Sequence, residues 1–300
     1  MRAMRIHRYG EAAVILEEEV PRPVPGTGEV LIRVAATAFN PSDIGVRRGL
    51  LHDLLGLELP LTLGEEVSGT VVEVGDDVVT PAVGDRVIGR TPGAAAEFVA
   101  APAGLFVAAP TAVPLTHAAA IPVAGLTAWQ AVFEHARLAP GQRVLINGAG
   151  GGVGGFAVQL AKHAGATVIA TAGPRSADAV RELGADQLID YTTTPALAAA
   201  VDSPVDAVLH LVAGPPATLI PLLRPDGVLV SVTEPLTAPG VKAVHFVARN
   251  DPGDLAALVK LVDAGTVRVD ISATRPLADL AAIHREAEAG QTRGKIILLP

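Results

Sequence analysis

The 300-residue chain contains no cysteine, and this absence excludes several kinds of chemistry. A chain without thiols forms no disulfide, offers no thiolate nucleophile and cannot build a zinc site that needs sulfur ligands. Its eight histidines do not show the i, i+4 spacing that places two metal ligands on one helix face. The composition therefore gives no indication of a metal site.

Aromatic residues and positive charge are also scarce. Phe, Trp and Tyr make up 3% of the residues, and 23 Lys and Arg against 31 Asp and Glu give a formal net charge of −8. Proteins that bind nucleic acid neutralise phosphates with basic side chains and stack bases on aromatic rings. We therefore expect no nucleic-acid partner.

Long apolar runs are missing as well. No stretch of about 18 apolar residues is free of charge, glycine or proline, so we expect no membrane-spanning segment. The residues that follow Met1 lack the apolar core of a secretory signal, which favours a cytoplasmic location. Half of the residues are nevertheless hydrophobic, which argues for a folded core and against disorder.

The first third of the chain has the pattern of β structure. Short apolar runs separated by glycine and proline cover 29–36, 68–74, 85–88, 95–99 and 105–108. Strands at this spacing favour a sheet that closes as a barrel. One helix is expected over Pro41–Arg48, because Asn40 suits the N-cap and Pro41 the first turn.

The middle of the chain alternates between helices and short Val/Ile/Leu strands. Helices are expected at 116–136, 153–164, 175–183, 217–223 and 252–264, and strands at 143–146, 167–171, 187–189, 207–211 and 227–232. This alternation predicts an α/β fold with a doubly wound parallel sheet. The tail then adds a strand, a helix over 277–289 and a strand over 295–299.

A glycine-rich turn is the most informative segment. An apolar strand runs into it and a helix leaves it, which is the context of a dinucleotide-binding fingerprint. Ala149, Gly151 and Gly154 occupy its three glycine places. Glycine lets backbone N–H groups approach a pyrophosphate at the helix start. The predicted contacts are Gly148, Ala149, Gly150, Gly151, Gly152, Val153 and Gly154; a tight turn with no ligand is the alternative.

The next strand indicates which dinucleotide binds. An Asp or Glu at its end reads the ribose hydroxyls of NAD. Here the strand ends in Thr171, followed by Gly173 and Arg175, with no acidic residue. We therefore predict NADPH, with these three residues near its 2′-phosphate. The alternative for Arg175 is a solvated side chain in the first turn of a helix.

Motifs along almost the whole chain resemble one family. They include Asn40-Pro41-Ser42-Asp43, Gly64-Glu65-Glu66, Gly125-Leu126-Thr127, the glycine turn, Leu183-Gly184-Ala185-Asp186 and Gly294-Lys295. The chain resembles the zinc-independent quinone oxidoreductases, the ζ-crystallin-like branch of the medium-chain dehydrogenase/reductase superfamily. The resemblance implies a discontinuous GroES-like β-barrel domain over 1–115 and 265–300. It also implies a Rossmann NADPH-binding domain over 116–264, and a homodimer.

The same resemblance implies roles for single residues. Asn40 would lie near the nicotinamide and substrate as a catalytic group, able to donate to an oxyanion; helix capping is the alternative. Thr127 would be the second catalytic residue, with an ordinary helix position as its alternative. The further implied cofactor contacts are Tyr191 near the adenosine phosphate, Val212, Ala213 and Gly214 near the nicotinamide ribose, and Phe246 and Val247 near the carboxamide. Their alternatives are a surface tyrosine, a plain turn and a plain strand.

Departures from the family pattern bear on the mechanism. Gly64-Glu65-Glu66 stands where the zinc enzymes of the superfamily carry Gly-His-Glu, so alcohol oxidation is not expected. Gly45 and Leu51 replace tyrosines that reach the substrate, and His52 and Arg48 are candidate substitutes. His210 replaces a usual Asp and is expected to be buried, and Lys295 to hold the tail strand.

These observations predict an NADPH-dependent oxidoreductase that transfers hydride to a small-molecule quinone or α,β-unsaturated carbonyl. One alternative is an enoyl-thioester reductase, for which a basic patch around Arg47, Arg48 and Arg90 would be expected. Another is an NADPH-binding protein without turnover.

Overall fold

The computed structural model describes residues 1–194, 197–235, 237 and 240–300. The chain divides into two compact units. The first unit comprises Met1–Val123, Asn250–Ala264 and Ile271–Pro300, and the second comprises Ala124–Arg249 and Gly265–Asp270. Among the described residues, no helix combines the length and the apolar character needed to cross a bilayer.

Six parallel strands form the sheet of the second unit, in the order β11-β10-β9-β12-β13-β14. The strands are β9 (Arg143–Asn147), β10 (Thr167–Ala172), β11 (Gln187–Asp190), β12 (Val205–His210), β13 (Leu223–Ser231) and β14 (Lys242–His245). The strand order reverses between β9 and β12, and ligands of such sheets bind outside the carboxyl ends at this reversal. The predicted parallel sheet is confirmed.

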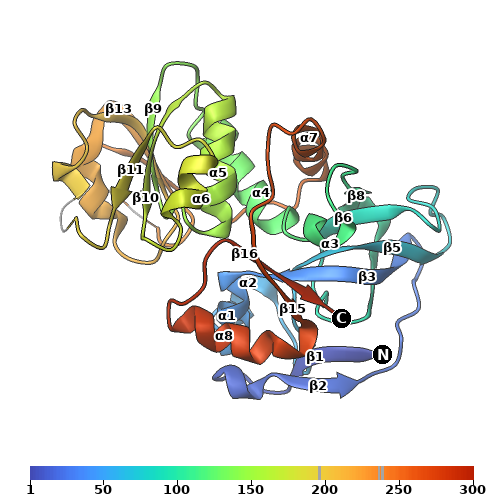
Figure 1. The fold of residues 1–300 in the computed structure, drawn as a ribbon. Coiled ribbons are helices and arrows are strands. Elements are labelled where there is room, and N and C mark those ends of the chain that lie inside the picture. Colours follow the sequence, from blue (N-terminus) through green and yellow to red (C-terminus); the bar gives the residue numbers. More distant parts are fainter. Residues whose placement is uncertain (195–196, 236, 238–239) are drawn as a thin grey trace. The chain divides into compact units, whose positions relative to one another are not determined.

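Helices α5 (Gly152–His163) and α6 (Ala177–Glu182) pack on this sheet, α5 against β9 and β10, and α6 against β10 and β11 (Figure 1). The stretch Phe156–Ala161 of α5 is buried. The helix that starts at the glycine turn is therefore fixed to the sheet along its length.

Two predicted helices differ from the expectation because of proline. The helix expected over 116–136 is divided into α3 (Leu115–Ala118), α4 (Pro122–Trp129) and a π-helical turn over Gln130–His135. Pro122 has no N–H to continue the preceding helix. The helix expected over 217–223 is a 3₁₀ helix, Pro216–Leu222, with Pro221 inside it.

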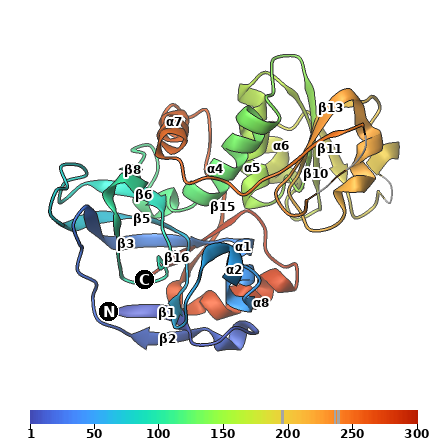
Figure 2. The same ribbon diagram turned by 180° about the vertical axis from the view of Figure 1, so that it is seen from behind.

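The longest strand, β3 (Glu29–Phe39), lies within the larger sheet of the first unit. The order of this sheet is β15-β16-β3-β5-β6-β8, and β7 also pairs with β3. The other strands are β5 (Glu66–Val74), β6 (Arg86–Arg90), β7 (Phe98–Pro102), β8 (Phe106–Ala108), β15 (Ile271–Pro276) and β16 (Lys295–Leu299). Because β16 pairs with β3, both chain ends belong to this unit (Figure 2).

A second, three-stranded sheet in the first unit was not predicted. Its order is β2-β1-β4, formed by β2 (Leu16–Glu19), β1 (Arg2–Ile6) and β4 (Leu61–Thr62). The strand β2 reads Leu-Glu-Glu-Glu and is largely exposed, so it lacks the apolar alternation that marks a strand.

The last boundary between the units also differs from the expected one. Helix α7 (Pro252–Asp263) falls in the predicted Rossmann range 116–264 but groups with the first unit. It packs against β8, and the carboxylate of Asp263 accepts the N–H groups of Thr111 and Ala112 at 2.7 and 2.9 Å. These contacts attach α7 to the end of the barrel strands.

Helix α8 (Leu280–Glu288) buries His284 in the core of the first unit. Within the described part of the chain, neither ring nitrogen has a hydrogen-bond partner, and the ring packs on Phe39 with centroids 5.1 Å apart. Burial, with a smaller contribution from the charge of Arg47, lowers the pKa of His284 from 6.5 to about 4. The folded protein therefore favours the neutral imidazole.

We expect acid to destabilise the protein through His284. Its folded pKa lies below the unfolded one, so its stabilisation is complete above pH 6.5 and is lost as the pH falls toward 4. The loss between pH 7.5 and 5 is about 2 kcal/mol. Urea unfolding at both pH values should show this slope in the wild type and in the exposed control His163→Gln, but not in His284→Phe. An equal slope in His284→Phe would contradict this account.

Candidate active site

The glycine turn lies between β9 and α5, at the carboxyl edge of the sheet. Gly148 adopts a φ of 101°, and its N–H donates to Oγ1 of Thr171 at 2.9 Å. The N–H of Ala149 donates to the carbonyl of Thr171 at 3.1 Å. Gly151 is the N-cap residue of α5, and Gly152 and Val153 begin the helix. The predicted strand, turn and helix are all present.

Three close approaches show why this turn needs glycine. A Cβ on Gly154 would lie 2.2 Å from the carbonyl oxygen of Gly148, and one on Gly150 would lie 2.2 Å from Oγ of Ser176. A Cβ on Gly148 would lie 2.5 Å from Cγ1 of Val212. The first N–H groups of a helix have no partner within the helix. A turn with bare backbone at such a helix start therefore fits a pyrophosphate.

The turn Val212–Gly214 follows β12 and lies beside the glycine turn, as the contact between Val212 and Gly148 shows. Its backbone is held from the next loop. The hydroxyl of Thr233 donates to the carbonyl of Val212 at 2.9 Å, and the N–H of Gly214 donates to Glu234 at 3.3 Å. Two of the predicted cofactor segments are thus neighbours at the strand-order reversal.

The residues predicted for the adenosine end also come together. A Cβ on Gly173 would lie 3.1 Å from the hydroxyl of Tyr191, which follows β11 and is 56% exposed. The hydroxyl of Ser176 donates to the carbonyl of Gly173 at 3.3 Å. Arg175 is exposed between them in the chain. One corner of the sheet therefore presents an arginine and a tyrosine to solvent.

The hydroxyl of Thr171 is hydrogen-bonded within the protein. The residue is 1% exposed, and its Oγ1 accepts from Gly148 and donates to Oδ1 of Asn147 at 2.8 Å. Because a hydroxyl has a single proton, Thr171 has no O–H left for a phosphate. Its hydroxyl and carbonyl accept the N–H groups of Gly148 and Ala149 and so fix the glycine turn. Asn147 was not singled out from the sequence, although it is a polar residue at the end of an apolar strand.

The remaining predicted residues of the second unit lie on two elements. Thr127 is half-buried in α4. Phe246 and Val247 directly follow β14, so the expected strand ends just before them. The N–H of Phe246 donates to the carbonyl of Ser231 at 3.3 Å, while Val247 is 63% exposed. The segment Phe246–Val247 therefore lies at the carboxyl edge of the same sheet.

In the first unit, Asn40 joins β3 to α1 (Pro41–Arg48) and is 4% exposed. Its backbone N–H donates to the carboxylate of Asp43 at 2.8 Å, which stabilises the start of α1. Its side-chain Nδ2 donates to Oε1 of Glu66 at 2.7 Å and to the carbonyl of Ala38 at 3.3 Å. Asn40 thus occupies the predicted N-cap position, but its amide reaches into the unit.

Lys295 and Glu66 form a buried ion pair around this amide. Nζ of Lys295 lies 2.7 Å from Oε1 of Glu66 and donates to Oδ1 of Asn40 at 2.7 Å. The two charged side chains are 3% and 0% exposed. Oε2 of Glu66 accepts the N–H of Val123 at 2.7 Å. Asn40 is fully engaged, so a donation from its amide to a substrate requires the exchange of one partner.

Two further carboxyl groups lie beside this network. Burial, followed by the charge of Glu65, raises the pKa of Asp43 well above 3.8. Burial also raises the pKa of Glu65 from 4.5, against the opposing effect of Arg90, whose Nη2 lies 3.9 Å away. The side chain of Glu65 is 21% exposed. Glu65 is therefore a partly accessible carboxyl that holds its proton more tightly than usual.

Gly45 and Leu51, which stand where the family pattern has tyrosines, are neighbours in the structure. A Cβ on Gly45 would lie 3.3 Å from Cδ1 of Leu51, so the leucine covers the glycine. His52, considered as a substitute, shares a hydrogen bond with Tyr9: the Tyr9 hydroxyl and Nδ1 of His52 are 2.8 Å apart. This pair brings a tyrosine from another part of the sequence to the short helix α2 (His52–Leu55), which follows α1.

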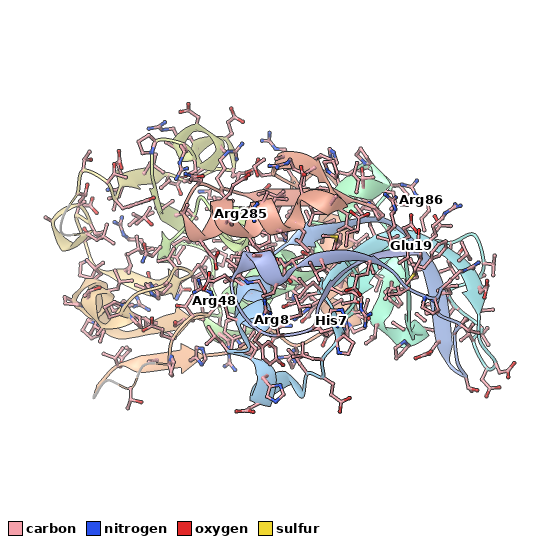
Figure 3. All side chains as sticks on the ribbon, turned by 90° about the horizontal axis from the view of Figure 1, so that it is seen from below. His7, Arg8, Glu19, Arg48, Arg86 and Arg285 are labelled. Atoms are coloured by element: carbon pink, nitrogen blue, oxygen red, sulfur yellow. The ribbon has the colours of Figure 1, made fainter. Side chains whose placement is uncertain are left out.

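The basic patch expected around Arg47, Arg48 and Arg90 does not form. Arg47 is 0% exposed and is paired with Glu288. Arg48, labelled in Figure 3, also contacts Glu288 at 2.9 Å. The guanidinium of Arg47 is buried and needs a counter-charge, which Glu288 on α8 supplies.

Within the described ranges, no group of three or more His, Cys, Asp or Glu side chains is arranged to hold a metal ion. The position after Gly64 carries Glu65, which lies near the guanidinium of Arg90 and the carboxylate of Glu66.

Two family models match the chain, an alcohol dehydrogenase GroES-like domain over 26–111 and a zinc-binding dehydrogenase over 183–298. The chloroplast envelope quinone oxidoreductase homolog of Arabidopsis thaliana is 35% identical over 100% of this chain and 98% of its own. The chain belongs to the zinc-independent quinone oxidoreductase branch of the medium-chain dehydrogenases/reductases.

Solved structures of this branch agree in fold. The quinone oxidoreductase from Coxiella burnetii superposes with a TM-score of 0.93 at 33% identity and covers 100% of this chain and 99% of its own. A mycobacterial protein complexed with NADPH reaches 0.91 at 30% identity, with 100% of both chains covered. The predicted fold class, a GroES-like domain and a Rossmann domain, is confirmed.

Proposed function

We propose that this quinone oxidoreductase homologue uses NADPH to reduce a quinone or an α,β-unsaturated carbonyl. The observation that carries the proposal is the cluster at the carboxyl edge of the second unit's sheet. There the glycine turn and the turn Val212–Gly214 lie at the strand-order reversal, and the corner with Arg175 and Tyr191 follows the neighbouring strands β10 and β11. The NADPH-bound mycobacterial relative and the quinone oxidoreductase names of other relatives support it.

The residues present fit this cofactor. The bare backbone at the start of α5 suits the pyrophosphate, and Arg175 offers a cation for the 2′-phosphate. When bound, NADPH supplies a hydride. Quinones and enones are already electrophilic, so the protein's task is to hold the acceptor in place and to exclude water.

Reduction of an enone also needs a proton at carbon, whereas a hydroquinone is stable as an anion. We assign this proton to the carboxyl of Glu65. Its raised pKa keeps the proton available closer to neutral pH, and its side chain is partly exposed next to the Asn40 network.

Glu65→Gln is expected to lower the kcat for an enone by on the order of tenfold or more, with a smaller effect on a quinone. The reason is that only the enone product depends on a protein-bound acid. Steady-state rates with both acceptors measure this, and Glu73→Gln, an exposed change on β5, the strand that begins directly after Glu65, is the control. Equal losses with both acceptors would remove Glu65 as the proton donor.

Arg175→Ala is expected to raise the KM for NADPH about tenfold and to leave the KM for NADH unchanged, because only NADPH carries a 2′-phosphate for the guanidinium. Arg181→Ala removes a neighbouring arginine that pairs with Asp178, and should change neither value. An unaltered KM for NADPH in Arg175→Ala would end this assignment.

The substrate class follows from one comparison of rates. NADPH oxidation is measured with 1,2-naphthoquinone, a simple enone and a crotonyl thioester. We expect turnover with the first two. Activity restricted to the thioester would select the enoyl-thioester alternative, which the burial of Arg47 disfavours. Tight NADPH binding without any turnover would select the non-catalytic alternative.

We also propose a homodimer, because β14 is the outermost of the described strands of its sheet and the edge of an outer strand can pair with a second copy. Sedimentation should then give about twice the chain mass of 30.5 kDa. The cytoplasmic location stays a prediction from the sequence.

A further inference from the structure

His210 ends β12 and is 3% exposed, directly opposite Asn147 of β9 in the sheet register. These two strands are the pair at which the strand order reverses. Nδ1 of His210 lies 3.0 Å from Nδ2 of Asn147, and Nε2 lies 2.9 Å from the carbonyl oxygen of Gly214. The imidazole therefore bridges the reversal.

The donors and acceptors of this bridge fit one arrangement. The Gly148 N–H donates to Oγ1 of Thr171, so the Thr171 O–H is free to donate to Oδ1 of Asn147. The Asn147 amide then turns its Nδ2 toward His210, whose Nδ1 must accept. The proton of the neutral ring is thus on Nε2 and is donated to Gly214.

A single hydrogen-bonded chain therefore runs from the glycine turn to the turn Val212–Gly214. Both turns are the segments assigned above to the cofactor, one to the pyrophosphate and one to the nicotinamide ribose. Asn147 and Thr171 fix the first turn, and His210 fixes the second. This link accounts for a polar ring at the end of the strand Val205–His210, whose other residues apart from Asp206 are apolar.

We propose that His210 is a positioning residue that couples the two halves of the NADPH site. It holds the carbonyl of Gly214 at a fixed distance from the glycine turn, so that a ligand that contacts both turns binds more tightly. The affinity of a ligand that contacts only the adenosine half does not depend on this link. The inference rests on the proposed use of NADPH.

The test compares two probes, NADPH and 2′,5′-ADP, which carries only the adenosine half. His210→Phe keeps a flat ring but removes both hydrogen bonds. We expect its Kd for NADPH to rise about tenfold, because the carbonyl of Gly214 is no longer held at a fixed distance from the glycine turn. Its Kd for 2′,5′-ADP should change less than about twofold. Fluorescence titration gives both values without turnover.

Two further variants separate positioning from general damage. Glutamine presents one acceptor and one donor on a flat amide, so His210→Gln should bring the Kd for NADPH back to within about threefold of the wild type. Gln159→Met removes a buried amide bonded to the backbone of Arg268, and should lower stability without changing the ratio of the two Kd values.

Equal weakening of both probes in His210→Phe, or no rescue by glutamine, would overturn the positioning role while leaving the proposed function intact. A wild-type protein that binds 2′,5′-ADP but not NADPH would overturn both.

Discussion

Lys295→Met is expected to cost about 3–5 kcal/mol of unfolding free energy. The substitution leaves Glu66 buried, charged and without its cation, since the two side chains are 0% and 3% exposed. It also removes the donor to Oδ1 of Asn40 and the bond to the carbonyl of Phe39 at 3.2 Å. The tail strand β16 then keeps its backbone pairing with β3 but loses the side-chain bonds that Lys295 makes to Phe39 and Asn40.

A second substitution tests the cause. Glu66→Gln in the Lys295→Met background removes the uncompensated charge, and we expect it to restore more than half of the lost stability. Arg181→Met breaks an exposed pair whose side chains are 59% and 92% exposed, and should cost less than about 1 kcal/mol. Urea unfolding of the three variants gives the values. A cost for Lys295→Met as small as that of Arg181→Met would show that the buried pair does not anchor the tail.

Gly154→Val is expected to weaken NADPH binding about 100-fold or more. Its Cβ would lie 2.2 Å from the carbonyl oxygen of Gly148 and 2.5 Å from Cα of Ala149. Both atoms are backbone, so the glycine turn has to open, and the N–H groups at the start of α5 leave their positions. Titration with NADPH measures the loss.

The matched control for this prediction is Gly155→Ala, one residue further along α5. Its Cβ would meet only Cδ1 of Leu183, at 3.3 Å, and a leucine tip can move. We expect unchanged NADPH affinity and unchanged circular dichroism in this control. Should Gly154→Val fold and bind NADPH as the wild type does, the glycine turn is not the pyrophosphate site.

The sequence was sufficient for features that depend on neighbours along the chain. The strand, turn and helix around Gly148–Gly154 follow from an apolar run, then a group of glycines, then a stretch of helix-forming residues. Asn40 and Pro41 mark the start of α1. Proline is a further local signal: Pro122 lacks the N–H that would continue the helix expected over 116–136, and the helix is divided there. Family resemblance, not pattern, supplied Thr127, Tyr191 and the later cofactor segments.

Features that depend on distant residues could not be predicted. Glu66 and Lys295 are 229 positions apart, and Asn147 and His210 are 63 apart. Nothing local shows that a Glu is buried opposite a Lys, or that the hydroxyl of Thr171 is used inside the protein. The one available signal was polarity: each of Glu66, Asn147 and His210 is a polar residue at the first or last position of a strand rich in Val, Leu and Ile.

The most direct test of the account is the rate of NADPH oxidation, followed by absorbance, with 1,2-naphthoquinone as acceptor and protein dialysed against a chelator. NADH in place of NADPH is the internal comparison. The account predicts turnover with NADPH that survives the dialysis and exceeds turnover with NADH. Turnover that disappears with the chelator, or a preference for NADH, would contradict it.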